Sequence, residues 1–238
     1  MQAFLAILRY DLGLLFRSWI TRIWIPLLVV PALFLVVVAA NENELASETL
    51  SAYVRAVLIP ISGLAIAVLG TGAVSGESGV LADGILSRSV TRTEYISAKI
   101  ASRLGFAAAV TVATLIPFVY LIDRYAEPDT SWAGILVGLM IVLLLLLFLG
   151  AIGITLSTML SNVLLSTLIL FLGVTLSGAF LQFLGLTWMS ATAVVVRLPA
   201  TFRGDTNWWE LARVSMVFTG LTAAAVMTSF WVFRRRDL

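Results

Sequence analysis

Residues 135–156, "ILVGLMIVLLLLLFLGAIGITL", form a run of 22 residues without a charged side chain. A helix of about 20 apolar residues is long enough to cross the hydrocarbon core of a bilayer. Five further apolar runs of comparable length lie at about 23–40, 56–74, 104–122, 163–185 and 214–233. The sequence therefore predicts an all-α integral membrane protein, with six transmembrane helices in a single transmembrane domain over 1–238.

The composition supports this class and excludes others. Apolar residues make up 61% of the chain and charged residues only 12%, whereas soluble domains carry about a quarter charged residues. The chain has no histidine and no cysteine, and no span contains a pair of acids, so an intramembrane enzyme would lack a general base or nucleophile. We expect no enzymatic activity, no metal or cofactor bound by this chain and no nucleic-acid partner.

Residues 1–22 have an amphipathic pattern rather than a spanning one. Arg9, Asp11 and Arg17 would each be costly in hydrocarbon, and the apolar side chains fall on one side of a helix at 100° per residue. We expect an interfacial helix along the membrane surface; the start of a long first span is the alternative. The apolar side consists of Met1, Phe4, Leu5, Leu8, Leu12, Leu15, Phe16 and Trp19.

The basic residues predict the orientation. Six spans place both chain ends on one side, and the connections on that side hold ten of the fifteen Lys and Arg residues. Because cytoplasmic loops are enriched in Lys and Arg, both termini and the 75–103 connection are expected to be cytoplasmic. We expect a multi-pass protein of a prokaryotic plasma membrane. The ten are Arg9, Arg17, Arg22, Arg88, Arg92, Lys99, Arg103, Arg234, Arg235 and Arg236.

The connection at 186–213 is apolar but too interrupted to span the bilayer. Pro199 and Gly204 supply breaks, and Trp188, Trp208 and Trp209 are of the type enriched at membrane interfaces. We expect two short helices that dip into the outer leaflet. A surface loop with an aromatic belt is the alternative.

The connection at 75–103, "SGESGVLADGILSRSVTRTEYISAKIASR", is the long polar segment between two spans. Gly76 and Gly79 break the end of the second span, and the following segment places apolar side chains among polar ones. Thr91–Glu94 has the pattern of a capping box, which would begin a helix that continues into the third span. Exposed apolar residues on this structured elbow favour a protein partner.

These residues carry a resemblance. Gly76-Glu77 followed by "GVLADGILSRSVTRTEYISAKI" resembles the cytoplasmic loop of the ABC-2 type transporter permeases, where a glutamate ends span 2 and a short coupling helix follows. In that family a small-Val-Ser/Thr-Arg-x-Glu turn then leads to a lysine in span 3. The ending "FRRRDL" and the order of elements along the whole chain are also similar.

The resemblance implies a membrane subunit of an ATP-driven exporter. Two copies, or this chain and a homologous permease, would pair and dock on separate ABC ATPase subunits, which bind ATP and Mg. The chain itself contains no GxxxxGK[ST] phosphate loop. The resemblance assigns the ATPase contact to Val80, Leu81, Asp83, Ile85, Leu86 and Arg88, and the elbow that transmits it to Glu77 and Arg92. A solvated ion pair is an alternative role for Asp83 and Arg88.

Two spans have a face of small and polar residues. Such faces let helices approach closely, so they are a dimer seam or the lining of a substrate pathway; packing within one subunit is the alternative. Gln182 is the amide inside a span, away from its ends. The face comprises Gly63, Ala67 and Gly70 in the second span, with Thr167, Thr175, Gly178, Gln182 and Gly185 in the fifth.

The spans carry no acid or base at their centres, which disfavours a secondary transporter or ion pump. An apolar pathway suits a lipid-like, drug-like or peptide substrate better than a small ion. The leading hypothesis is therefore the permease half of an ABC-2 type exporter. The alternative is a membrane anchor or scaffold that recruits a cytoplasmic protein through the 75–103 connection without transporting anything.

Overall fold

Helices account for nearly all of the described chain. The computed structural model describes residues 2–75 and 91–235. Within these ranges six helices are long and apolar enough to cross a membrane: Trp19–Glu42, Ala46–Val74, Arg92–Tyr125, Trp132–Met159, Val163–Phe183 and Trp208–Arg234. The predicted all-α class and the six apolar spans are confirmed for this part of the chain, as expected for a multi-pass membrane protein.

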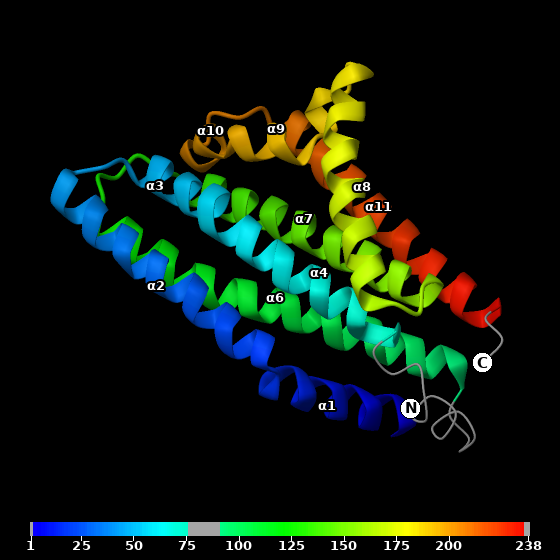
Figure 1. Cartoon of the computed structure of the whole chain (residues 1–238). Helices are drawn as coiled ribbons and strands as arrows, with labels where there is room; N and C mark the ends of the chain where they lie inside the picture. The colour runs from blue at the N-terminus through cyan, green and yellow to red at the C-terminus, as the bar shows by residue number, and fades with distance from the viewer. Residues whose placement is uncertain (1, 76–90, 236–238) are drawn as a thin grey trace.

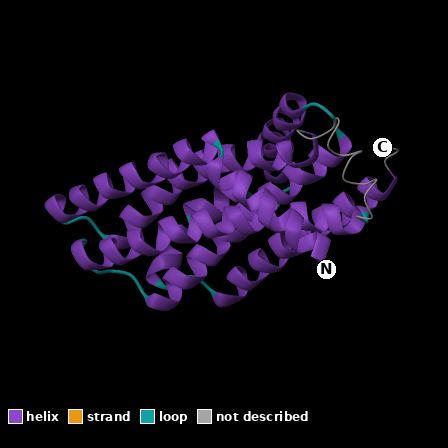
Figure 2. Cartoon of the chain, turned by 90° about the horizontal axis from the view of Figure 1, so that it is seen from below, coloured by secondary structure: helices purple, strands orange, loops and turns teal. Residues whose placement is uncertain are grey.

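Apart from the fifth span, which is inclined to the others in Figure 1, the long helices run roughly alongside one another (Figures 1 and 2). A shorter helix precedes them, and two short helices lie before the last one. The elements are α1 (Gln2–Arg17), α2 (Trp19–Glu42), α3 (Ala46–Tyr53), a π-helical segment (Val54–Leu58), α4 (Ile59–Ser75), α6 (Arg92–Tyr125), α7 (Trp132–Met159), α8 (Val163–Phe183), a 3₁₀ turn (Thr187–Met189), α9 (Ala191–Val196), α10 (Leu198–Arg203) and α11 (Trp208–Arg235).

Helix α7 is the central element. It carries no charged side chain, and it packs against α4, α6, α8, α10 and α11 (Figure 1). The largest group of buried apolar side chains joins α1, α2, α3, α4, α6, α7 and α10. The long helices α2, α4, α6 and α7 each bury a stripe against their neighbours and leave other apolar side chains exposed, which suits a protein surrounded by lipid.

The first turns of α1 and α6 and the last turns of α11 lie at one end of the molecule. The guanidinium of Arg92, at the start of α6, donates a hydrogen bond to the backbone carbonyl of Arg234, 3.3 Å away near the end of α11. Helix α1 packs against α6, and its first residues lie at the same end of the molecule (Figure 1). We call this the terminal end; the distal end contains the α2–α3 turn, residues 126–131 and α10.

The second span begins earlier than predicted. The expected start was residue 56, whereas the helix runs from Ala46 through the π-helical segment. Its first turns contain Ser47, Thr49 and Ser51, which are all buried. The hydroxyls of Thr49 and Ser51 donate to backbone carbonyls at positions i−4, 3.1 and 2.7 Å away. Such internal bonds let a polar sequence form a buried helix.

The third span begins as the sequence predicts. Thr91 is the N-cap of α6, and its side chain accepts a hydrogen bond from the backbone N–H of Glu94, while the Glu94 carboxylate accepts one from the backbone N–H of Thr91. This is a complete capping box. The helix then continues without interruption through Lys99 and Arg103 to Tyr125, so it is longer than the predicted apolar run of 104–122.

Two short helices, α9 and α10, occupy the connection before the last span. Arg197 separates them, and Pro199 lies in the first turn of α10 rather than at the break. Gly204 ends α10 in the left-handed conformation (φ 89°), which glycine adopts without strain. Two short helices were expected here; their depth in the outer leaflet stays a prediction.

Candidate functional site

Most of the predicted ATPase contact lies outside the described residues. This applies to Glu77, Val80, Leu81, Asp83, Ile85, Leu86 and Arg88. Arg92 is described: it is the first residue of α6 and is half-buried. Its hydrogen bond to the Arg234 carbonyl connects the start of α6, directly after the predicted coupling segment, to the last helix.

A buried carboxylate fastens α1 to the same part of α6. Asp11 is fully buried, and Lys99, which donates to its Oδ1 from 2.9 Å, is only 2% exposed. The Arg103 guanidinium lies 3.3 Å from Oδ1, and the Ser102 hydroxyl donates to Oδ2. Charges removed from water need such partners, because an unpaired buried charge is strongly destabilising. Asp11 therefore holds α1 against one face of α6.

Sequence reasoning missed this cluster. Asp11 was used only as a charge that disfavours a membrane span, whereas the structure turns Asp11 inward, on the same side as Ile7 and Leu15. A signal was present, because these residues stand at i, i+4 and i+8 and must share one helix face. Leu5, Leu14 and Phe16 of α1 are exposed, which is consistent with the interfacial position that remains a prediction.

The small-residue face of the second span packs against α7 of the same chain. A Cβ added at Gly70 would lie 3.2 Å from the Gly150 carbonyl oxygen and 3.4 Å from the Cα of Gly153, so the two backbones are in contact. A Cβ at Gly63 would lie 3.5 Å from the side chain of Leu149, and Ala67 is only 1% exposed. For these three positions the structure favours the alternative of packing within one subunit.

The fifth span, α8, buries few of its side chains against the rest of the chain. At its start, the hydroxyl of Thr167 lies 2.8 Å from that of Thr71 on α4, and Ser166 and Leu170 are its two buried residues. Beyond Leu170, α8 leans away from the other helices (Figure 1). Thr175, Gln182 and Gly185 are exposed and Gly178 is half-buried. The predicted face of the fifth span is therefore open to another molecule.

Part of that face forms one wall of a groove. The groove has a volume of about 300 Å³ and lies between the last turns of α8 and helix α9. Gln182 and Gly178 contribute from α8; Ser190, Thr192, Ala193, Val196 and Arg197 contribute from the opposite side. The hydroxyls of Ser190 and Thr192 lie 2.6 Å apart. The groove thus combines an apolar wall with an amide, two hydroxyls and a guanidinium, the mixture typical of sites for small molecules.

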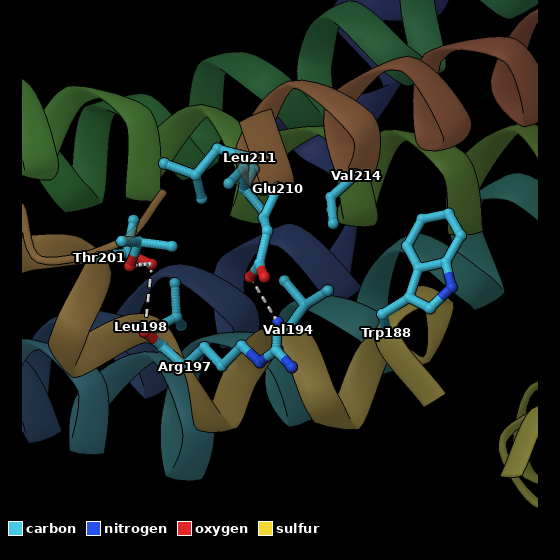
Figure 3. A pocket seen from close by; sticks show the side chains of 10 residues that line it. Trp188, Val194, Arg197, Leu198, Thr201, Glu210, Leu211 and Val214 are labelled. Atoms are coloured by element: carbon cyan, nitrogen blue, oxygen red, sulfur yellow. Dashed lines mark hydrogen bonds and ion pairs between the residues drawn. The ribbon is translucent and has the colours of Figure 1, made fainter. Parts of the chain in front are cut away.

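A smaller recess lies on the other side of α9. Its volume is about 20 Å³, room for one water molecule. Figure 3 shows Arg197 and Glu210 pointing toward each other across it, with Nη1 and Oε2 2.8 Å apart. The guanidinium of Arg213 lies 4.1 Å from the ring centre of Trp188. Both contacts tie the end of α8 and helix α9 to the first turns of α11.

A second polar cluster closes the distal end. Arg203 of α10 lies 3.0 Å from Oδ2 of Asp129 and 2.5 Å from Oε1 of Glu48, while the Ser47 backbone N–H donates to Oδ1 of Asp129 from 2.8 Å. We call these four side chains the distal clamp. Partial burial of Asp129 opposes ionisation, but hydrogen bonds from Ser47 and Arg203 outweigh it and hold the pKa of that carboxyl below its usual range.

Helix α10 fits a notch on α7 that sequence reasoning also missed. A Cβ at Gly134 would collide with the carbonyl oxygens of Thr201 and Phe202, and one at Gly138 would collide with the Phe202 ring. Phe202 is completely buried there. The signal was the Gly-x-x-x-Gly spacing of 134 and 138, which allows close approach on one helix face.

The comparisons with known proteins are negative: no family model, curated protein or solved structure matches the chain. In the described ranges, no group of three or more acidic side chains gathers in a way that could hold a metal ion.

Proposed function

We propose that the chain is the membrane-spanning permease subunit of an ABC-2 type transporter. It would export a lipid-like, drug-like or peptide molecule, powered by ATP and Mg bound to a separate ABC ATPase subunit. The transporter would lie in a prokaryotic plasma membrane with both termini of the chain cytoplasmic. A second copy of the chain, or a homologous permease, would complete it.

The observation that carries the proposal is the polar framework at the terminal end. Residues 76–90 connect α4 to α6, and α6 begins directly afterwards with a complete capping box. Asp11 joins the same stretch of α6 to α1, and Arg92 joins it to α11. A force applied to the 76–90 connection would therefore reach α1, α6 and α11 together. This is the mechanical requirement for a membrane subunit driven by a soluble one.

The open face of α8 supports the transport part of the proposal. Its single amide, Gln182, lines a groove that is large enough for part of a small molecule. The other exposed side chains of α8, outside this small and polar face, are mostly apolar. An amphiphile could place its polar group in the groove and its apolar part along α8. A second copy of the chain would close this face from the other side.

The test is to purify the tagged chain from its native membrane in nanodiscs and identify bound proteins by mass spectrometry. We expect a soluble chain with a phosphate-binding loop, in equal number to this one. Leu81→Asp should abolish that association, because a charge replaces an apolar contact in the proposed interface. Thr93→Asp, an exposed site in the first turn of α6, adds the same charge and should leave it unchanged.

Both variants should elute as monodisperse protein with the thermal stability of the original chain. Equal recovery of the ATPase with Leu81→Asp would contradict the assignment of the coupling segment. Recovery of this chain alone would contradict the transporter and favour the anchor or scaffold.

A further inference from the structure

We propose that a groove between α2 and α6, at mid-membrane depth, holds one acyl chain of a bilayer lipid. The groove has a volume of about 230 Å³. It is separate from the α8–α9 groove, and the proposal does not depend on the transport function. Val29, Ala32 and Leu33 line it from α2, Tyr53 from α3, and Ala113, Thr114, Pro117, Phe118 and Leu121 from α6.

The shape of the groove follows from its residues. Tyr53 and Phe118 are buried, and their rings lie 4.2 Å apart between centres. Val29 and Leu33 are 38% and 52% exposed and form an open rim. The small side chains of Ala32 and Ala113 leave space between two helices that otherwise pack together. The recess therefore opens sideways, toward the membrane, rather than toward either end of the protein.

The chemistry of the lining selects hydrocarbon. The Tyr53 hydroxyl donates to the Leu28 carbonyl, 3.2 Å away. The Thr114 hydroxyl has backbone carbonyls of Val110 and Thr111 within 3.0 Å. Both polar side chains of the lining are thus engaged within the protein. A water molecule needs two to four polar partners, so water is disfavoured, whereas apolar cavities of even 150 Å³ bind apolar ligands.

The position of the groove selects a lipid over other apolar partners. Val29–Leu33 lies near the middle of α2 (Trp19–Glu42), about 15 Å from either end at 1.5 Å per residue. Only molecules already in the hydrocarbon core reach that depth. The recess, about 230 Å³, is smaller than a single turn of a helix about 10 Å across, whereas a hydrocarbon chain can enter it. An empty recess would also forfeit dispersion contacts along its walls.

Two features adjoin the floor of the groove. Tyr53 is the residue immediately before the π-helical segment Val54–Leu58, and π-helical turns are frequent at functional sites. Pro117 lacks the N–H that would pair with the Ala113 carbonyl, so α6 is locally weakened along the same recess. A bound acyl chain would pack against both irregular stretches and limit their movement.

The experiment uses the full chain in nanodiscs doped with a phospholipid that carries a diazirine in its acyl chain. After illumination, labelled residues are mapped by peptide mass spectrometry. We expect label concentrated on the lining of α6 and α2. Ala113→Phe fills the groove and should reduce this label to the level of other lipid-exposed faces. Ile116→Phe, on an exposed position of α6 outside the lining, should leave it unchanged.

Thermal unfolding checks that the variants are folded, and Val29→Phe on the opposite rim provides a second filled groove if Ala113→Phe does not fold. Native mass spectrometry in detergent gives an independent measurement: the original chain should retain one lipid that both filled variants lose. Label spread evenly over all exposed helices, or label on the lining that Ala113→Phe and Val29→Phe leave unchanged, would overturn the proposal. Cross-linking of the lining to a second copy would also overturn it.

Discussion

A single carboxylate, Asp11, organises the buried polar contacts at the terminal end. It accepts hydrogen bonds from a lysine, a serine and an arginine, all on one stretch of α6. A buried ion pair of this kind does not have to make the fold more stable than well-packed apolar side chains of similar volume would. Its effect is specific: it sets the rotation and the height at which α1 lies on α6.

Replacing Asp11 by alanine tests this role. The variant leaves buried cations with one acceptor fewer, so the free energy of unfolding should fall by about 3–5 kcal/mol. Arg9→Ala, on the exposed side of the same helix, should change it by no more than about 0.5 kcal/mol. Thermal unfolding of the purified proteins measures both. Equal stability of the two variants would show that α1 is held by its apolar contacts instead.

At the scale of elements, close contact between glycines decides how α4 meets α7. Gly70 faces Gly150 and Gly153 at backbone distance, while Gly72 on the same helix has no heavy atom within 4 Å of its added Cβ. How closely α4 approaches α7 therefore depends on which side of α4 each small residue occupies, more than on the number of small residues. The sequence showed the stripe of small residues in α4 but not that it packs on α7, because such a stripe could equally pack against a second copy of the chain.

Gly70 and Gly72 form a matched pair for a test of this contact. Gly70→Val should lower the free energy of unfolding by about 1–3 kcal/mol, the usual cost of overpacking, because the neighbouring backbone cannot give way. Gly72→Val adds the same side chain in open space and should be neutral or nearly so. Thermal unfolding compares them. A stable Gly70→Val would mean that α4 and α7 separate more easily than their contact suggests.

At the scale of the whole molecule, the sequence predicted the spans better than their ends. Long uncharged runs such as 135–156 indicate spans directly, and the Thr91–Glu94 capping box indicated a helix start. The early part of the second span was missed, since the hydroxyls of Thr49 and Ser51 are satisfied by their own helix. The Asp11 cluster and the distal clamp join residues more than 80 positions apart. A pattern with helical period cannot show such pairs.

The distal clamp should make the stability of the folded protein decrease at acidic pH, where Asp129 becomes protonated. The pKa of Asp129 is lower in the folded protein than the ordinary value of about 3.9. Its stabilising contribution is therefore complete above that ordinary value and is lost as the pH falls through the folded pKa. Melting temperatures measured from neutral to acidic pH should drop in this range for the original chain.

Asp129→Asn should be less stable at neutral pH, and its melting temperature should approach that of the original chain below about pH 3.9. Asp123→Asn removes an exposed acid at the same end and should follow the original chain throughout. If Asp129→Asn were as sensitive to acid as the original chain, the acid-sensitive group would be another carboxylate.

The π-helical segment at Val54–Leu58 sets the angular phase between the two halves of the second span. An α-helix turns by about 100° per residue, so the gain of one residue beside this segment would rotate α3 by that angle relative to α4. Ser47 and Glu48 would then point away from Asp129 and Arg203. Arg55 and Ala56 are exposed in this stretch and should accept many exchanges of side chain, while a one-residue insertion, even of alanine, would disengage the distal end of the protein.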